Sequence, residues 1–255
     1  MKAVAIIPAR MGSSRFPGKP LANILGLPMV EHVRRRVAMS KILSEVYVAT
    51  CDKEIQQEIT ALGGKSIMTS SSHQRASDRT AEAAHSLDAE IIVMVQGDEP
   101  MTYPEMIDLA LHPMMKDPSI ICTNLMKRIT DNQDYLNPNT IKVVTDLQSN
   151  ALYMSRSPIP HINTGNDLLT IPSYKQVCII PFTQYGLDLY TKLEPTPLEV
   201  AESVDMNRFL EHGYPVRMIQ SDYDSHAVDD LEDLELVTQL MKEDPLTQSY
   251  ISINR

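Results

Sequence analysis

The chain has 255 residues, of which 43% are hydrophobic, and it carries 23 basic against 33 acidic side chains. The resulting net charge of -10 argues against a protein that binds nucleic acid or a membrane surface, although a local basic cluster could still bind a small anion. No apolar run reaches the roughly 20 residues of a membrane span, and the apolar stretch that ends at Pro8 is too short for a signal peptide.

Strand-like and helical patterns alternate along the first hundred residues. The apolar run at 3–7 predicts a strand buried on both faces, and the pattern at 30–39 predicts an amphipathic helix. Asp52 could cap a following helix. The remaining predicted elements are strands at 46–50, 65–68 and 91–95 and helices at 53–62 and 81–86. This alternation predicts an α/β fold with a mostly parallel sheet flanked by helices, and the loops after its strands should meet at one edge.

The pattern changes at about residue 140. Short strands are predicted at 140–144 and 151–154, an apolar run at 176–182 and a helix at 198–212. A strand at 215–219 and a helix at 231–241 then return to the main sheet. We therefore expect a main lobe of residues 1–139 and 214–244, a smaller mixed α/β lobe of residues 140–213, and a fraying C-terminal tail at 245–255.

The loop after the first predicted strand concentrates positive charge. Arg10, Arg15 and Lys19 lie within ten residues, and Gly12, Ser13, Ser14 and Gly18 leave the backbone accessible. Cations and amide donors together suit a triphosphate. The spacing matches neither Walker A nor the G-x-G-x-x-G pattern of dinucleotide-binding dehydrogenases. A solvated basic loop is the alternative interpretation.

The run from 7 to 21 resembles the signature loop of the 3-deoxy-manno-octulosonate cytidylyltransferases. The likeness recurs in order at 48–52, 68–79, 95–100, 137–144, 151–160 and 228–235, and so covers residues 1–241. The resemblance implies a nucleotidyltransferase main lobe and a smaller lobe for the acceptor and for dimerisation. It also implies a homodimer, CTP as donor, Mg²⁺ as cofactor and an acidic sugar as acceptor.

The implied reaction is attack by the sugar hydroxyl on the α-phosphorus of CTP, with release of pyrophosphate. Arg10, Arg15 and Lys19 would supply cations, and Asp98 and Asp229 would hold Mg²⁺. Asp98 could instead be a turn or cap residue, and Asp229 a cap of the last helix. The expected nucleotide contacts are Pro8, Ala9, Arg10, Ser13, Ser14, Arg15, Lys19, Asp52, His73, Ser77, Arg79 and Gln96. Gln96 could instead make a strand-end hydrogen bond, and Arg79 an ion pair with Asp78.

The candidate acceptor contacts are Arg75, Lys142, Arg156, Gln176, Ile180, Asp205 and Met206. Lys142 could bind the acceptor's anionic group or lie exposed on an edge strand, and Arg156 could bind the sugar carboxylate. Several of these positions depart from the family pattern: Arg75 in place of Ser, Gln176 in place of His, Ile180 in place of Tyr, and 204–208 in place of Leu-Glu-Gln-Leu-Arg. Glu232, Asp233 and Glu235 are interpreted as a solvated helix face.

Two hypotheses for the acceptor stay open. The chain could act on 3-deoxy-manno-octulosonate through substituted contacts, or on an amino-substituted ulosonic acid, another sugar acid or a phosphonate. A third hypothesis, an inactive nucleotide-sugar binding module, is disfavoured by the intact Lys19, Asp98 and Asp229. The widely spaced Cys51, Cys122 and Cys178 predict reduced thiols in a cytoplasmic protein.

Overall fold

The computed structural model describes residues 1–12, 16–163, 171–224 and 226–251. The chain forms two compact units, one of residues 1–108 with 224–255 and the other of residues 109–223. No helix in the described ranges is long and apolar enough to cross a membrane.

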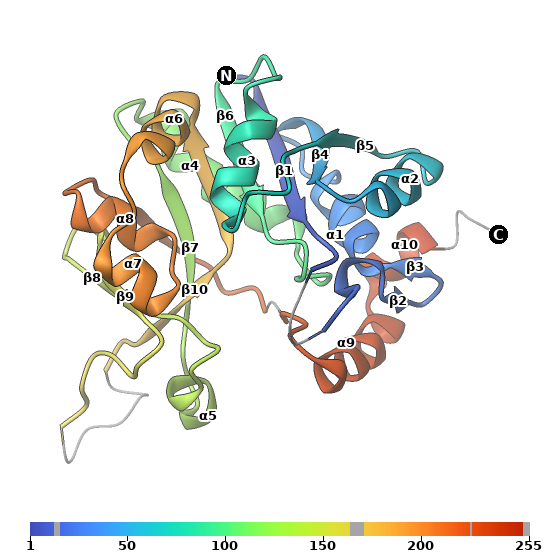
Figure 1. Cartoon of the computed structure of the whole chain (residues 1–255). Coiled ribbons are helices and arrows are strands. Elements are labelled where there is room, and N and C mark those ends of the chain that lie inside the picture. The colour runs from blue at the N-terminus through green and yellow to red at the C-terminus, as the bar shows by residue number, and fades with distance from the viewer. Residues whose placement is uncertain (13–15, 164–170, 225, 252–255) are drawn as a thin grey trace. The chain divides into compact units, whose positions relative to one another are not determined.

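The first unit is built around a parallel sheet (Figure 1). Its strands β1 (Ala3–Ala9), β4 (Leu43–Thr50), β5 (Lys65–Met68) and β6 (Ile91–Val95) lie in the order β6-β1-β4-β5, and each neighbouring pair is parallel. β1 and β6 are buried along their whole length, as their apolar sequences predict. The predicted α/β class is confirmed.

Helices cover both faces of this sheet. α1 (Met29–Val37) and α2 (Lys53–Ala61) follow β1 and β4, and α3 (Ala76–Ala84) connects β5 to β6. Because crossovers between parallel strands are right-handed, α1 and α2 share one face, and α3, which returns past β1, lies on the other. The strand order therefore reverses at β1, and ligands of open α/β sheets bind beyond the strand ends at such a point.

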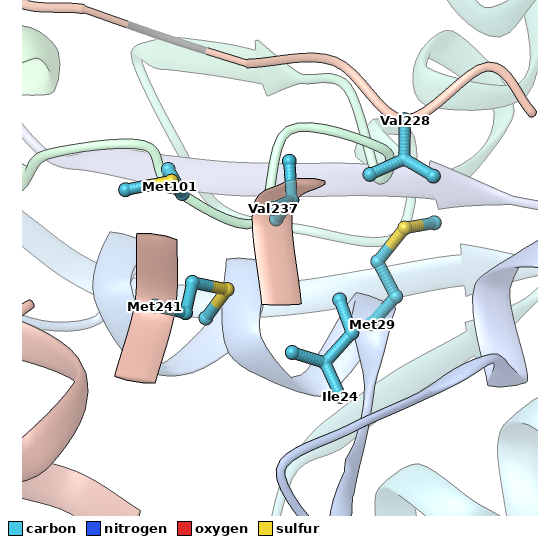
Figure 2. Close-up of a cluster of buried hydrophobic side chains, with 6 residues drawn as sticks. All are labelled: Ile24, Met29, Met101, Val228, Val237 and Met241. Atoms are coloured by element: carbon cyan, nitrogen blue, oxygen red, sulfur yellow. The ribbon is translucent and has the colours of Figure 1, made fainter. Parts of the chain in front are cut away.

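The rest of the first unit packs around α1. It comprises η1 (Lys19–Leu21), β2 (Asn23–Ile24), β3 (Leu27–Pro28), the start of α4 (Pro104–Lys116), α9 (Leu231–Glu243) and α10 (Pro245–Ile251). A hydrophobic cluster joins α9 to α1, β2 and the segment before α4 (Figure 2). Its buried members are Ile24, Met29, Met101, Val228, Val237 and Met241.

The second unit has a mixed sheet in the order β12-β7-β10-β8-β9, in which only the β12–β7 pair is parallel. The strands of this sheet are β7 (Thr123–Arg128), β8 (Lys142–Thr145), β9 (Ala151–Ser155), β10 (Tyr174–Val177) and β12 (Arg217–Gln220), and β11 (Ile179–Thr183) lies outside it. Its helices are α5 (Asn132–Leu136), α6 (Gln184–Lys192), α7 (Pro197–Glu202) and α8 (Met206–Glu211).

The units and the predicted lobes divide the chain at different residues. Residues 109–139 and 214–223 were expected in the main lobe, but they belong to the second unit, because β7 pairs with β10 and β12. The helix predicted at 198–212 is two helices, since Ser203 adopts a left-handed backbone (φ 53°) that ends α7. The apolar run at 176–182 is likewise divided between β10 and β11.

The predicted fraying tail contains a helix, α10, that a buried arginine anchors. Arg36 on α1 is fully buried, and its guanidinium donates to the Asp244 carboxylate, to Thr247 Oγ1 (2.6 Å) and to the Tyr250 hydroxyl (3.2 Å). An unpaired charge would be costly at this depth. The ion pair therefore holds α10 on α1, which a sequence without apolar periodicity did not reveal.

We expect Asp244→Asn to lower the free energy of unfolding by about 3–5 kcal/mol, because Arg36 would keep a buried charge without its anion. The control is Asp88→Asn, since Asp88 pairs with Lys2 at the exposed surface. It should cost less than about 1 kcal/mol. Urea denaturation measures both variants, and equal small losses would contradict the role given to this pair.

His32 is buried beside the same helix. Its Nδ1 lies 2.8 Å from the Tyr250 hydroxyl and its Nε2 lies 2.7 Å from the Ile24 carbonyl oxygen. Burial lowers the pKa of His32 to about 4, so the ring is neutral at pH 7. A neutral ring that donates from Nε2 accepts at Nδ1, so the Tyr250 hydroxyl is the donor.

This burial predicts a pH-dependent stability. The unfolded chain binds a proton at His32 below pH 6.5, whereas the folded chain does so only near pH 4, so this stability is lost as the pH falls from 6.5 toward 4. We expect His32→Gln to lack about 2 kcal/mol of the loss that the wild type shows between pH 7 and pH 5. Urea denaturation at the two pH values measures the difference, and an unchanged pH dependence would contradict it.

Candidate functional site

The ammonium group of Lys19 joins three distant segments of the first unit. Its Nζ lies 2.6 Å from Asp98 Oδ2, 2.8 Å from the Val228 carbonyl oxygen and 3.8 Å from Asp229 Oδ1. Lys19 follows β1, Asp98 follows β6, and Asp229 precedes α9. The structure thus brings together three of the residues that the sequence proposes as catalytic, beyond the strand ends where the strand order reverses.

These three side chains remain open to solvent and carry a net negative charge. Their exposed fractions are 14% for Lys19, 29% for Asp98 and 25% for Asp229. Two carboxylates beside one ammonium are a set of groups that favours a divalent cation. Among the described residues no group of three or more metal-ligating side chains occurs. Two carboxylates with substrate phosphates and water are a common ligand set for Mg²⁺.

The cap interpretation of Asp229 is wrong. The N-cap of α9 is Asp230, whose carboxylate accepts hydrogen bonds from the backbone N–H groups of Glu232 and Asp233. Asp98 does lie in a turn, but its carboxylate bonds Lys19 instead of the local backbone. Asp233 is not part of a solvated face either, since its carboxylate accepts from the backbone of Asp229. Glu232 and Glu235 are exposed as predicted.

The phosphate-loop candidates lie around the end of β1. Pro8 and Ala9 are its last, buried residues, and Arg10 is exposed, with an N–H 3.4 Å from Gln74 Oε1. Ser13, Ser14 and Arg15 lie outside the described residues.

Two neighbouring residues shape this loop. Asp52 occupies the N-cap position of α2, but its carboxylate does not cap the helix and accepts instead from Met11 N–H at 2.7 Å. A Cβ atom on Gly97 would lie 3.2 Å from the Pro8 carbonyl oxygen, so glycine allows the segment that carries Asp98 to approach β1 closely.

The remaining nucleotide candidates surround the start of α3. Arg79 is buried and donates to Thr69 Oγ1 (2.5 Å) and to the carbonyl oxygens of Ser70 (3.3 Å) and His73 (3.5 Å), so it holds that loop. His73 Nε2 pairs with the Glu82 carboxylate.

Ser77 and Gln96 differ in how accessible they are. Ser77 is fully buried, with its hydroxyl 3.8 Å from Met94 Sδ, and this burial does not support a direct nucleotide contact. Gln96 is half-buried at the end of β6, and its ribose contact stays a prediction.

Lys142 in the second unit is neither exposed nor free to donate. It is fully buried, which excludes the exposed-edge interpretation, and Nζ donates to the carbonyl oxygens of Asn137 (2.8 Å), Thr140 (2.6 Å) and Arg156 (2.5 Å). Burial and the nearby Arg156 guanidinium lower the pKa of Lys142. An ammonium group has three N–H donors, and the three carbonyl oxygens use all of them, so none is left for the acceptor substrate.

Arg156 is held in place by Glu202. The Glu202 carboxylate accepts from Arg156 N–H (2.8 Å), Tyr153 OH (2.8 Å) and Ser155 Oγ (2.7 Å). Burial alone would raise the pKa of Glu202, but these hydrogen bonds lower it. The Arg156 guanidinium donates through Nε to the Glu202 carbonyl oxygen (2.7 Å) and through another N–H to Pro138 (3.0 Å). Its orientation is therefore set by the protein.

The other acceptor candidates divide by burial. Ile180 and Met206 are buried, and Met206 Sδ lies 3.9 Å from Cys122 Sγ. Gln176 is half-buried and donates to Asn124 Oδ1 at 2.6 Å. Asp205 is the N-cap of α8, and Arg75, in the first unit, is the N-cap of α3, without a side-chain cap bond in either case. Their acceptor roles stay predictions.

Comparison with known proteins agrees with this geometry. The cytidylyltransferase family matches residues 4–222. The 3-deoxy-manno-octulosonate cytidylyltransferases of Geobacter metallireducens and Geotalea uraniireducens are each 44% identical to the chain, over 94% and 95% of it and 97% and 100% of their own lengths. The chain belongs to the 3-deoxy-manno-octulosonate cytidylyltransferase family. The predicted family is confirmed.

A solved structure of CMP:2-keto-3-deoxy-manno-octonic acid synthetase complexed with CTP has a TM-score of 0.88 to this cytidylyltransferase. The two are 37% identical over 95% of this chain and 99% of that one. The protein is therefore an enzyme of the cytidylyltransferase class with the α/β fold of that structure.

Sequence reasoning missed three contacts that organise this cytidylyltransferase. They are the bonds of Asp233 to Asp229, of Glu202 to Arg156 and of Gln176 to Asn124. The Asp-x-x-Asp spacing at 230–233 is a capping-box pattern, which predicts the bond of Asp233 to the Asp230 N–H but not the bond to Asp229. The other two join residues at least 46 positions apart, for which the sequence offers no local signal.

We expect Lys19→Met to lower the free energy of unfolding by about 1–3 kcal/mol, because Asp98 would lose its hydrogen-bond donor and both carboxylates their shared counter-ion. The double variant Lys19→Met with Asp98→Asn should regain part of this loss, since it removes one of the two repelling charges. The control is Lys65→Met, in an exposed pair with Glu45. Urea denaturation of Lys19→Met, Asp98→Asn, the double variant and the wild type gives the coupling, and purely additive losses would contradict it.

Proposed function

We propose that this cytidylyltransferase transfers CMP from CTP to 3-deoxy-manno-octulosonate, or to a closely related acid sugar, and releases pyrophosphate. The observation that carries the proposal is the meeting of Lys19 with Asp98 and Asp229 beyond the end of β1. Relatives named 3-deoxy-manno-octulosonate cytidylyltransferase match nearly the whole chain.

The chain's own residues would supply charge and orientation. Lys19 and Arg10 would offer cations to the triphosphate, together with Arg15, which the sequence places in the same loop. Asp52 would keep the loop in place through its bond to Met11. Such groups favour in-line attack by the sugar hydroxyl, because the transition state spreads negative charge over the phosphate oxygens.

Asp98 and Asp229 fit Mg²⁺, since both are partly exposed carboxylates that lie on the same ammonium group, that of Lys19. When bound, the ion would neutralise phosphate charge and favour ionisation of the attacking hydroxyl. Before that, Lys19 holds the two carboxylates together. This arrangement limits their repulsion while the site is without its substrate.

The candidate acceptor residues bear on which acid the enzyme would use. Arg156 is oriented by Glu202, which suits a fixed carboxylate on the acceptor. Ile180 and Met206 are apolar and buried, and Gln176 is already bonded to Asn124. These positions offer fewer free polar groups for sugar hydroxyls. That observation favours, as a second candidate, the same chemistry on an amino-substituted ulosonic acid, another sugar acid or a phosphonate.

We further propose a cytoplasmic homodimer whose second unit forms the acceptor lobe and the dimer contact. The free thiols of Cys51, Cys122 and Cys178 support a reducing compartment. The homodimer rests on the family resemblance.

The test is Mg²⁺- and CTP-dependent pyrophosphate release with a panel of acceptors. We expect the highest kcat/KM with 3-deoxy-manno-octulosonate. Asp98→Asn should reduce kcat/KM by at least about 100-fold, because it removes a charge used in the transition state. Asp88→Asn is the matched control at the exposed surface.

Each outcome discriminates between the hypotheses. A preference for the amino-substituted acid or the phosphonate would support the same CMP transfer but with that acceptor in place of 3-deoxy-manno-octulosonate. No pyrophosphate with any acceptor, or no effect of Asp98→Asn, would contradict the enzyme and favour the inactive binding module.

A further inference from the structure

The carboxylate of Asp233 reaches beyond the start of its own helix. Its Oδ2 accepts hydrogen bonds from Asp229 N–H at 2.8 Å and from Asp230 N–H at 3.3 Å. Asp230 is the N-cap of α9, so Asp229 lies one residue outside the helix. Asp233 therefore bonds the backbone of a residue that carries one of the two site carboxylates.

The residue before Asp229 is fixed as firmly. Val228 donates its N–H to the Asp98 carbonyl oxygen at 2.9 Å and accepts from Lys19 Nζ at 2.8 Å. Its side chain is 0% exposed and belongs to the cluster with Met29 that Figure 2 shows. With Asp233 on the next N–H, each backbone polar group from Val228 N–H to Asp229 N–H has a partner. The Asp229 side chain consequently starts from a fixed Cα position.

Capping of α9 does not require the bond to Asp229. Asp230 accepts from Glu232 N–H and Asp233 N–H, both at 3.0 Å, and so satisfies the free donors of the first turn. The Asp229 N–H is not one of those helical donors.

We propose that Asp233 is a positioning residue, which holds the Asp229 backbone so that the Asp229 and Asp98 carboxylates bind a divalent cation together. The inference rests on the proposed function of Asp229 as a metal ligand. Groups that orient metal ligands typically contribute about 10–100-fold to metal affinity.

The experiment measures Mn²⁺ binding to the full chain in the presence of CTP, by the EPR signal of free Mn²⁺. We expect Asp233→Ala to weaken Mn²⁺ binding by about 10-fold or more. Asp233→Asn keeps an oxygen acceptor without the charge, and it should bind Mn²⁺ close to the wild-type value.

Two controls separate positioning from helix stability. Asp230→Ala removes the cap of the same helix and should lower the melting temperature while it leaves Mn²⁺ binding near the wild-type value. Glu232→Gln removes an exposed charge from the same turn and should change neither quantity.

Three results would overturn the inference. They are unchanged Mn²⁺ binding in Asp233→Ala, equal weakening in Asp233→Ala and Asp230→Ala, and an Asp233→Asn variant as weak as Asp233→Ala, which would indicate charge instead of the hydrogen bond. A wild type that binds Mn²⁺ with CTP, but releases no pyrophosphate with any acceptor, would contradict the proposed function and leave the positioning role intact.

Discussion

The ammonium of Lys19 lies between two carboxylates and a backbone carbonyl that come from opposite ends of the first unit's sequence. Asp98 is 79 residues away and Val228 is 209 residues away. Because the two carboxylates repel each other, the Lys19 ammonium stabilises the meeting of the loop after β6 with the approach to α9 at the end of β1. Val228 also belongs to the apolar cluster with Met29, and its buried side chain helps to fix the same junction.

In the second unit a lysine ammonium also joins distant segments, but its partners are backbone carbonyl oxygens. There the buried Lys142 ammonium holds three carbonyl groups, among them that of Arg156, while Glu202 holds the Arg156 N–H. The main chain of Arg156 is thus bonded on both sides. A guanidinium on such a base loses little entropy when it binds an anion, which supports the proposed role of Arg156 as a contact for the acceptor's carboxylate.

The sequence was most informative for buried strands, where a run of apolar residues directly indicates the structure. Buried parallel strands read as apolar runs, so β1 and β6 could be predicted, and with them the edge at which Lys19 and Asp98 meet. The break between α7 and α8 could not be predicted, because a left-handed serine at 203 has no distinctive signal. The role of Lys142 was equally hidden, since its partners are backbone carbonyls that any residue provides.

α10 escaped prediction because its stability comes from outside its own sequence. Its anchor, Arg36, sits 208 residues before Asp244. During synthesis on the ribosome, α1 is complete long before Asp244, Thr247 and Tyr250 exist. We therefore expect the first unit to close around Arg36 only after these partners have emerged, with the guanidinium hydrated until then.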